Sequence, residues 1–385
     1  MRSVYRAKRA GRILRHGAVA AGLLALAACS ASAGTESSGG QPQSAQARAA
    51  AHNPDLDTGT SLGDKLAPDI KLVNQFGQPM SLSQFRGKVV ILAFVDSECT
   101  TICPLSTVSM VQARELLGAA GQHVQLLGVD ANPSATKVSN VMAYTQAHSM
   151  VNQWDFLTGS LPQLQWVWKS YHIYVQIQAG QIDHTPALYV IDQRGRLREI
   201  YLTSMAYASV GQEAQVLAQE VASLLPGHPK LARASSLAYI TGISPATRQV
   251  LPALPSGSVT LGSGQPHLVM FFATWLSETS DLRSQLTALN AYARDEHVAG
   301  LPPLVAVDEA VSEPSPDSAR TYLQGLGSPL SYPVALDTTG RLADGYGVQD
   351  QPCFALTSAS GKVIWSHDGW LPVSALEAAV RKAGG

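Results

Sequence analysis

Residues 89–104 read VVILAFVDSECTTICP, and this stretch decides the fold of the first half of the chain. Seven apolar residues in a row, Val89 to Val95, are expected of a strand that is buried on both faces of a sheet. A helix is expected to begin near Thr101, because the proline that closes the stretch suits a first helical turn, where no helical N–H bond is lost. Cys99 therefore lies at the mouth of this helix, and Cys103 lies in its first turn.

The two cysteines have two chemical uses that their spacing leaves open. Thiols at a helix N-terminus face the positive end of the macrodipole, which favours the thiolate, the form that attacks disulfides and binds metals. Residues four apart on an ideal helix have Cα atoms about 6.2 Å apart. That distance is inside the disulfide range of roughly 4.4–6.8 Å and also leaves room for a metal between the sulfurs. His184, in the segment IDHTP just before a second apolar strand, adds an imidazole, and two thiolates with one imidazole suit copper.

Two blocks of the chain are expected to run through the same order of elements. In the first block, the expected strands and helices after the opening strand and helix are a strand at 124–129, a helix at 138–147, strands at 187–192 and 197–201, and a helix at 213–224. In the second block they are strands at 268–272, 304–307, 354–357 and 362–365, with helices at 281–295, 318–326 and 376–382. This order, with short right-handed crossovers and a terminal hairpin, is the thioredoxin arrangement. The sequence therefore predicts an α/β fold of two tandem thioredoxin-like domains, each a central mixed sheet flanked by helices.

The first 28 residues are expected to be a targeting segment. Six basic residues precede the short apolar run from Ala18 to Ala28, which is too short to span a bilayer as a permanent helix. The run ends in LAAC, residues 26–29, which resembles the lipobox of bacterial lipoproteins and implies cleavage before Cys29 and acylation of its thiol. An ordinary signal peptide with an incidental Cys29 is the alternative. The mature protein is expected outside the cytoplasm, anchored by lipid to the cell membrane of a bacterial envelope.

Composition excludes one function class and divides the rest of the chain. Cleavage before Cys29 leaves 21 Lys and Arg against 28 Asp and Glu, a net charge of −7. An acidic chain without a basic stripe argues against nucleic-acid binding. Residues 29–62 are rich in Ser, Ala, Gly and Gln and predict a flexible tether. Beyond it we expect a first domain over 63–226, a linker over 227–255 and a second domain over 256–385.

Four segments of the first block form a recognisable pattern. They are Cys-x-x-x-Cys-Pro after an apolar strand, Gly128-Val129-Asp130 at the end of the next strand, FLTG at 156–159, and Asp183-His184-Thr185 before the strand that follows. Together they resemble the Sco/SenC family over roughly Leu66 to Pro226. This resemblance implies a membrane-anchored thioredoxin fold that binds one copper through both cysteines and the histidine. It also implies a link to assembly of the dinuclear copper site of cytochrome c oxidase, with some members acting as thiol reductants.

Carried onto this chain, the resemblance gives Cys99, Cys103 and His184 as copper ligands. It gives Asp130 and Asp183 as neighbours that support those ligands. The leading interpretation is a lipid-anchored copper chaperone of Sco type, which delivers copper to a respiratory oxidase copper subunit or prepares its thiols; another exported thiol or copper protein is the other partner class. Oxidising the pair to a disulfide would release the metal, which couples delivery to redox state.

The chain departs from the family pattern at two positions beside these ligands. Thr100 stands where a proline is usual, and Pro186 follows Thr185 where the family usually lacks one. Thr185-Pro186 instead resembles the cis-proline loop of thioredoxin-type oxidoreductases, so Pro186 is a cis-proline candidate. The alternative function is a metal-independent thiol-disulfide oxidoreductase, in which Cys99 attacks, Cys103 resolves and the histidine tunes the thiolate.

Two further alternatives stay open. Peroxiredoxins also place a cysteine at a helix mouth after a strand, but they expect a threonine three residues earlier, where this chain has Asp96. That departure argues against a peroxidase. A structural scaffold with a locked disulfide is the last alternative, and a cysteine pair that resists mild reductant would support it.

The second block carries a related motif without its chemistry. Residues 271–279 read FFATWLSET and resemble the TlpA/ResA-type thioredoxin motif, with Leu276 and Thr279 in place of both cysteines. Gln351-Pro352 matches a cis-proline loop. Cys353 follows it and is expected to be a buried small hydrophobe; a thiol that accepts a mixed disulfide or a glutathione-like adduct is the alternative. The second domain is therefore expected to serve for docking or spacing.

Overall fold

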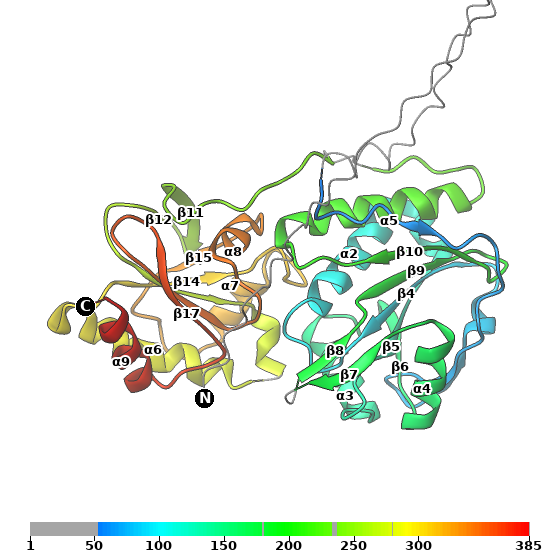
Figure 1. The fold of residues 1–385 in the computed structure, drawn as a ribbon, viewed down its shortest axis with the longest axis horizontal. Coiled ribbons are helices and arrows are strands. Elements are labelled where there is room, and N and C mark those ends of the chain that lie inside the picture. The colour runs from blue at the N-terminus through cyan, green and yellow to red at the C-terminus, as the bar shows by residue number, and fades with distance from the viewer. Residues whose placement is uncertain (1–52, 179–180, 233–236, 279, 385) are drawn as a thin grey trace, which may run out of the picture. The chain divides into compact units, whose positions relative to one another are not determined.

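The computed structural model describes residues 53–178, 181–232, 237–278 and 280–384, and all of them belong to one compact unit (Figure 1). The expected targeting segment, Cys29 with its lipid, and most of the expected tether lie outside the described residues. Among the residues described, no helix combines the length and the apolar character that a membrane span requires.

The N-terminal sheet has six strands. They are β1 (Thr60–Ser61), β4 (Val89–Val95), β5 (Val124–Asp130), β6 (Trp154–Leu157), β9 (Ala187–Ile191) and β10 (Leu197–Leu202). Their order across the sheet is β1-β10-β9-β4-β5-β6. The strands β4, β5 and β6 run parallel, whereas β9 and β10 run antiparallel to their neighbours. The expected strand at 89–95 is the central strand β4, and every one of its residues is buried.

The C-terminal sheet has seven strands. They are β11 (Gln249–Leu254), β12 (Ser258–Leu261), β13 (Leu268–Phe272), β14 (Leu304–Asp308), β15 (Val334–Leu336), β16 (Cys353–Thr357) and β17 (Val363–Asp368), in the order β12-β11-β15-β14-β13-β16-β17. Five of them, β15-β14-β13-β16-β17, repeat the order and the relative directions of β6-β5-β4-β9-β10. The prediction of two mixed sheets in tandem, each flanked by helices, is confirmed.

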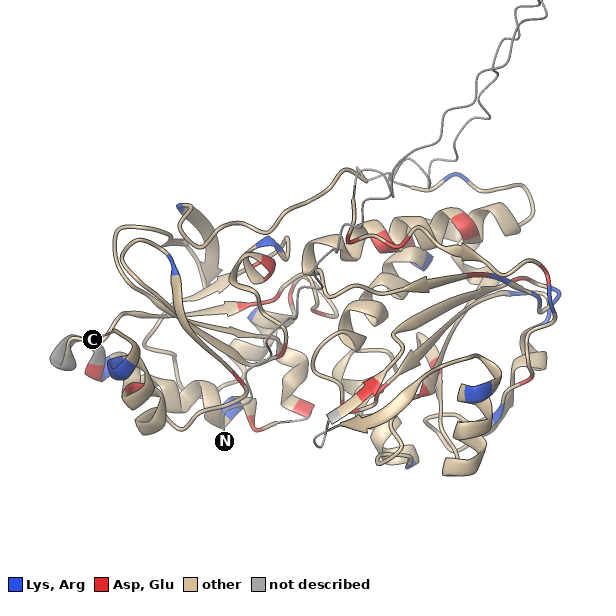
Figure 2. Ribbon diagram, viewed as in Figure 1, with Lys and Arg blue, Asp and Glu red and all other residues tan. Residues whose placement is uncertain are grey.

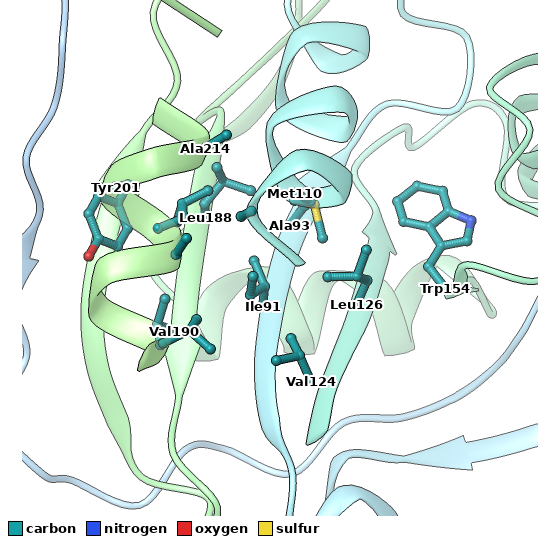
Figure 3. Close-up of a cluster of buried hydrophobic side chains, with 14 of the residues drawn as sticks. Ile91, Ala93, Met110, Val124, Leu126, Trp154, Leu188, Val190, Tyr201 and Ala214 are labelled. Atoms are coloured by element: carbon teal, nitrogen blue, oxygen red, sulfur yellow. The ribbon is translucent and has the colours of Figure 1, made fainter. Parts of the chain in front are cut away.

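Helices cover both faces of the N-terminal sheet. They are α2 (Cys103–Leu116), α3 (Val138–Ala147) and α5 (Val210–Leu224) on one face and α4 (Leu161–Ser170) on the other. Successive side chains of a strand point to opposite faces. Ile91 and Ala93 of β4 therefore join Met110 and Ala214 in one apolar cluster (Figure 3), while Leu92 and Phe94 pack in the cluster that includes α4.

The C-terminal sheet is covered in a different way. Its helices are α6 (Leu282–Ala299), α7 (Ser318–Gln324), α8 (Arg341–Tyr346) and α9 (Val373–Gly384). One face packs against α6 and α9. The other face packs against α8 and against Leu105 and Val210, which lie near the N-terminal ends of α2 and α5. The two halves of the molecule therefore share one buried apolar cluster. In Figure 2, Lys and Arg of the described chain are distributed among separate helices, strands and loops.

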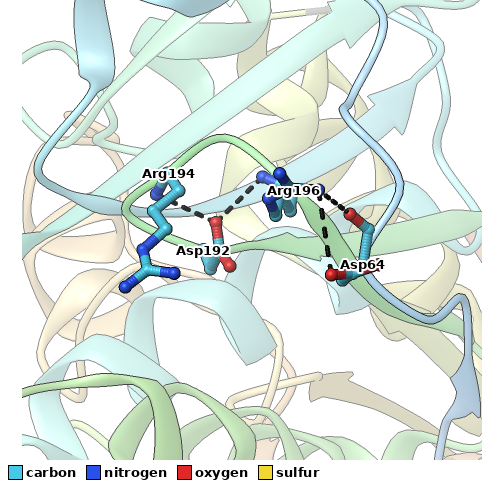
Figure 4. A network of polar contacts seen from close by, with 4 residues as sticks. All are labelled: Asp64, Asp192, Arg194 and Arg196. Carbon is cyan, nitrogen blue, oxygen red and sulfur yellow. Dashed lines mark hydrogen bonds and ion pairs between the residues drawn. The ribbon is translucent and has the colours of Figure 1, made fainter.

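Short elements complete the fold. The 3-10 helices are η1 (Leu82–Phe85), η2 (Gly118–His123), η3 (Tyr207–Ser209) and η4 (Thr274–Glu278), and the remaining strands are β2 (Lys71–Val73), β3 (Pro79–Ser81), β7 (Val175–Gln178) and β8 (Gln181–His184). The last two form a separate antiparallel ladder that ends at His184. The expected turn after β9 is present: Asp192 Oδ1 accepts the N–H groups of Arg194 and Arg196, and Arg196 also contacts Asp64 (Figure 4).

Two expected boundaries are wrong. The last ten residues of the expected tether, 53–62, belong to the fold, because Leu56 reaches the core and the Asp57 carboxylate accepts the N–H group of Leu202. β1 then pairs with β10. The expected linker over 227–255 also ends too late, because β11 already joins the C-terminal sheet through pairing with β12 and β15.

Candidate functional site

Cys99 and Cys103 lie where the central strand β4 gives way to α2. The helix begins at Cys103, with Pro104 in its first turn as expected. The backbone N–H of Cys103 donates to Cys99 Sγ at an N···S distance of 3.4 Å. Cys99 Sγ also lies 3.2 Å from the Thr101 hydroxyl oxygen. Both cysteines are free thiols, so the structure describes the dithiol form of this loop.

His184 reaches the same place from the β7–β8 ladder. Its Nε2 lies 3.4 Å from Cys103 Sγ, and its Nδ1 lies 3.1 Å from the carbonyl oxygen of Thr185. A carbonyl oxygen can only accept, so Nδ1 carries the proton and Nε2 turns its lone pair toward the sulfur. That tautomer leaves Nε2 available as a metal ligand.

The two thiols differ in accessibility and in acidity. Cys99 is partly exposed, whereas Cys103 is 2% exposed. A hydrogen bond from the Cys103 side chain lowers the pKa of Cys99, with a smaller contribution in the same direction from Thr101. Burial raises the pKa of Cys103 well above its ordinary value. Cys99 is therefore the thiol that ionises first and the one that solvent or a partner can reach.

Burial also acts on the imidazole. It lowers the pKa of His184, although the hydrogen bond to Thr185 and the charges of Asp96 and Asp183 oppose this effect. The ring is therefore held in its neutral form, which is the form that binds metals.

The two expected supporting carboxylates take different positions. Asp183 precedes His184 on β8 and contributes only its charge to that ring. Asp130 ends β5, and its carboxylate accepts the N–H of Asn132 and the hydroxyl of Thr158. Burial raises the pKa of Asp130 to about 8. Among its hydrogen bonds in the described residues, the Asp130 carboxylate therefore contacts its own loop and Thr158, which follows β6, and not the three candidate ligands.

Sequence reasoning gave Asp96 no positive role in this site. It directly follows β4 and is buried, and its Oδ1 accepts the Asn132 side-chain amide at 2.7 Å. Its charge raises the pKa of both cysteines and of His184. The signal for it was positional, because Asp96 directly follows the central strand, three residues before Cys99.

The expectation of a cis bond at Pro186 is wrong. The cis peptide bonds of the described residues are Leu254–Pro255 and Gln351–Pro352. At Pro186 the chain instead leads directly into β9, and the Pro186 carbonyl accepts the N–H of Thr203, which follows β10. Gln351–Pro352 is cis, as its sequence indicates.

The three candidate ligands lie near one another but are not arranged as a preformed metal site. Within the described ranges, no three His, Cys, Asp or Glu side chains already converge on one point. The donor set nevertheless fits copper, because it offers two soft sulfurs and one imidazole nitrogen with a free lone pair. The Cys103–His184 contact brings two of the three donors together across a long stretch of chain.

The corresponding region of the C-terminal half is packed. Leu276, at the position of a motif cysteine, lies in η4 and is buried, whereas Thr279 lies outside the described residues. Cys353 is 3% exposed and belongs to the apolar cluster that both halves share. Burial raises the pKa of this thiol as well. The environment of Cys353 favours the buried-hydrophobe interpretation over an accessible thiol.

Comparisons with known proteins concern the N-terminal half. Residues 58–221 match the family model described as SCO1/SenC. The SCO1 protein homolog of Bacillus subtilis (strain 168) is 27% identical over 133 residues, which cover 33% of this chain and 69% of that protein. The mitochondrial SCO2 homolog of Bos taurus is 29% identical over 147 residues, which cover 34% of this chain and 52% of that protein. This chain thus spans about half the length of the bovine relative.

A solved structure also resembles this half. Bradyrhizobium japonicum ScoI, solved with copper bound, is 18% identical, with 42% of this chain and 99% of that chain covered and a TM-score of 0.36. The family match ends within α5, before the first strand of the C-terminal sheet.

Proposed function

We propose that this chain is a Sco-type copper-binding protein that acts in the assembly of cytochrome c oxidase, because residues 58–221 match the SCO1/SenC family model. Its copper ligands are the sulfurs of Cys99 and Cys103 and Nε2 of His184. The observation that carries the proposal is the 3.4 Å contact between Cys103 Sγ and His184 Nε2, made by residues that are far apart in the sequence.

The three side chains have distinct tasks in this proposal. Cys99, partly exposed and with a lowered pKa, receives the incoming metal ion first. Cys103 and His184 complete the site from the buried side, where apolar surroundings limit water. Copper is the cargo, and thiolates with an imidazole accommodate either of its oxidation states.

Release is tied to oxidation of the ligands. When Cys99 and Cys103 join as a disulfide, two electrons pass to an acceptor such as a disulfide of the partner, which takes up two protons and becomes a dithiol. The site then loses both sulfur ligands and its affinity for copper. The same reaction reduces the disulfide of the partner, and the partner thiols that it produces can then receive the metal.

The place of action follows from the expected leader. The lipobox-like segment places the mature chain outside the cytoplasm, with acylated Cys29 as its membrane anchor. The partner class is the copper subunit of a respiratory oxidase, which the family resemblance implies.

Anaerobic copper titration of the reduced protein tests the proposal. We expect one copper per chain and a sulfur-to-copper(II) charge-transfer band. His184→Ala should weaken both, with an affinity at least tenfold lower. His123→Ala is the matched control, because His123 is exposed and lies in η2, remote from the thiols in the fold. Wild-type binding by His184→Ala, or binding lost equally in His123→Ala, would contradict this ligand set.

A second function is favoured by the arrangement of the thiols. One partly exposed and one buried cysteine in hydrogen-bond contact match the attacking and resolving thiols of a metal-independent thiol-disulfide oxidoreductase. Cys99 would attack a substrate disulfide and form a mixed disulfide, and Cys103 would then displace the reduced substrate. Metal-free turnover of a disulfide substrate that survives His184→Ala would favour this function over copper binding.

A further inference from the structure

One polar contact joins the loop between the two cysteines to the C-terminal half. Thr100, which directly follows Cys99, donates its hydroxyl hydrogen to Asp350 Oδ1 at 2.5 Å. The two residues are 250 positions apart in the chain. Asp350 precedes the Gln351-Pro352 loop, which leads into β16 as the loop after His184 leads into β9. The C-terminal half thus presents its own strand-entry loop to the dithiol of the other half.

Several contacts fix Asp350 in this place. Its Oδ1 also accepts the backbone N–H of Gln351 at 2.7 Å. The buried side chain of Gln351 donates in turn to the Tyr207 hydroxyl at 3.2 Å. On the other side of Tyr207, Asp344 accepts the N–H groups of Tyr207 and Ala208. The carboxylate beside Thr100 therefore belongs to a network of hydrogen bonds that also includes Gln351, Tyr207 and Asp344.

Apolar packing holds both ends of the contact. Leu105, two residues beyond Cys103, is fully buried in the cluster that both halves share. Val348 and Cys353, which lie on either side of the Asp350 loop, belong to the same cluster. The distance between Asp350 and the dithiol loop is therefore set by a packed core, because such cores change shape only at a cost in free energy.

We propose that Asp350 is a positioning residue for the Cys99–Cys103 pair. By holding Thr100, it keeps the loop in the arrangement in which Cys99 Sγ accepts the Cys103 N–H. A disulfide requires the sulfurs to approach to about 2.05 Å with a set torsion angle, whereas both cysteines are free thiols in this arrangement. The Thr100–Asp350 bond therefore stabilises the dithiol against the disulfide. This inference deepens the proposed function, since the dithiol is the form that binds copper.

Equilibration of the metal-free full chain with dithiothreitol measures this effect. Cys99 and Cys103 pass two electrons and two protons to oxidised dithiothreitol, which becomes the dithiol while the protein disulfide forms. Thr100→Val keeps the side-chain shape and removes the donor, and it should make the disulfide about five- to tenfold easier to form. A tenfold change corresponds to a reduction potential about 30 mV more negative.

Matched variants distinguish the loss of the Thr100–Asp350 hydrogen bond from a general destabilisation of the protein. Asp350→Ala removes the acceptor and should shift the equilibrium in the same direction, and the double variant should shift it no further than the larger single variant, because one bond is lost in all three. Thr100→Ser keeps the hydroxyl and should retain the wild-type equilibrium. Asp155→Ala makes the same chemical change at a carboxylate that accepts hydrogen bonds from Asn74 and Gln125, away from Asp350, and should leave the equilibrium within twofold.

Equal equilibria in wild type and Thr100→Val would overturn the proposal, as would additive shifts in the double variant. A Thr100→Ser protein that behaves like Thr100→Val would also overturn it. Copper is absent from these measurements, so a failed copper titration leaves the positioning role standing. Conversely, the positioning role can fail while copper still binds.

Discussion

The two halves of this molecule share one strand order, but the carboxyl ends of their central strands carry different side chains. At the carboxyl end of β4, two thiols and an imidazole meet; at the corresponding end of β13, η4 carries Leu276 and the following loop carries no pair of thiols. The apolar central strands are equally buried in both halves. The fold therefore requires the apolar pattern and not the cysteines, which agrees with the general separation of fold from site.

The C-terminal half has an interface where the other half has reactive groups. The ring of Trp275 in η4 lies 5.1 Å from the ring of His148, which follows α3 of the N-terminal half. Cys353 and Asp350 likewise face the N-terminal half, through the shared apolar cluster and the Thr100 contact. The loops of the C-terminal half that lack a thiol pair are therefore also the loops that pack against the N-terminal half.

The largest effect on stability is expected at Trp275, where the C-terminal half has packed side chains in place of reactive groups. Trp275→Ala should lower the free energy of unfolding by about 3–5 kcal/mol, because it removes a buried aromatic side chain. Urea denaturation at neutral pH measures the change, and copper stoichiometry should be retained. Trp166→Ala is the matched control, since Trp166 is 54% exposed on α4. Equal effects of the two changes would show that η4 is not an interface.

A second comparison concerns the carboxyl groups that end corresponding strands. Asp130 ends β5 and Asp308 ends β14, and burial raises the pKa of both, with Glu313 adding to the effect at Asp308. Because the pKa of Asp130 rises from 3.8 to about 8, its protonated form stabilises the fold at low pH. That contribution is lost as the pH rises through about 8.

Asp130→Asn sharpens this comparison. The variant cannot ionise, so the wild type should lose about 2–4 kcal/mol of unfolding free energy relative to it between pH 5 and pH 8. Urea denaturation at several pH values measures the difference. Glu213→Gln tests the same effect over a lower pH range, because burial raises the pKa of Glu213 from 4.5 to about 7. Parallel pH profiles of wild type and Asp130→Asn would contradict the assigned burial effect.

The smallest effect is expected at the bystander thiol. Cys353→Ala should cost about 1 kcal/mol of stability, as expected when one buried heavy atom is removed, and it should leave copper binding unchanged. In the folded wild type, Cys99 should react with iodoacetamide while Cys353 stays unmodified by mass spectrometry. Rapid labelling of Cys353, or an adduct on it in protein isolated from its native source, would instead make it a working thiol.

The sequence predicted those features that have a local signal. The continuous apolar run of β4 and the helical period of α3 gave their bounds directly, and the cysteine motif with His184 indicated the side chains that meet. β6, α4 and the β7–β8 ladder were missed; β7 and β8 have four residues each and β7 is largely exposed, so no apolar alternation marks them. The Thr100–Asp350 bond spans most of the chain, and no local pattern could predict it.

The isomer at Pro186 shows the same limit. Thr185-Pro186 and Gln351-Pro352 are similar dipeptides before similar strands, yet only the second is cis. Tertiary context decides between isomers that differ by about 1 kcal/mol in an unconstrained chain.

The shared apolar cluster also has a consequence for biosynthesis. Leu105 and Val210 are synthesised well before β13 and β16, which later cover them. Until β13 and β16 have been synthesised, the N-terminal half exposes this apolar surface, which favours association with other chains or with chaperones. Once complete, the chain is expected to melt in a single calorimetric transition, since neither half can leave the cluster without exposing the other.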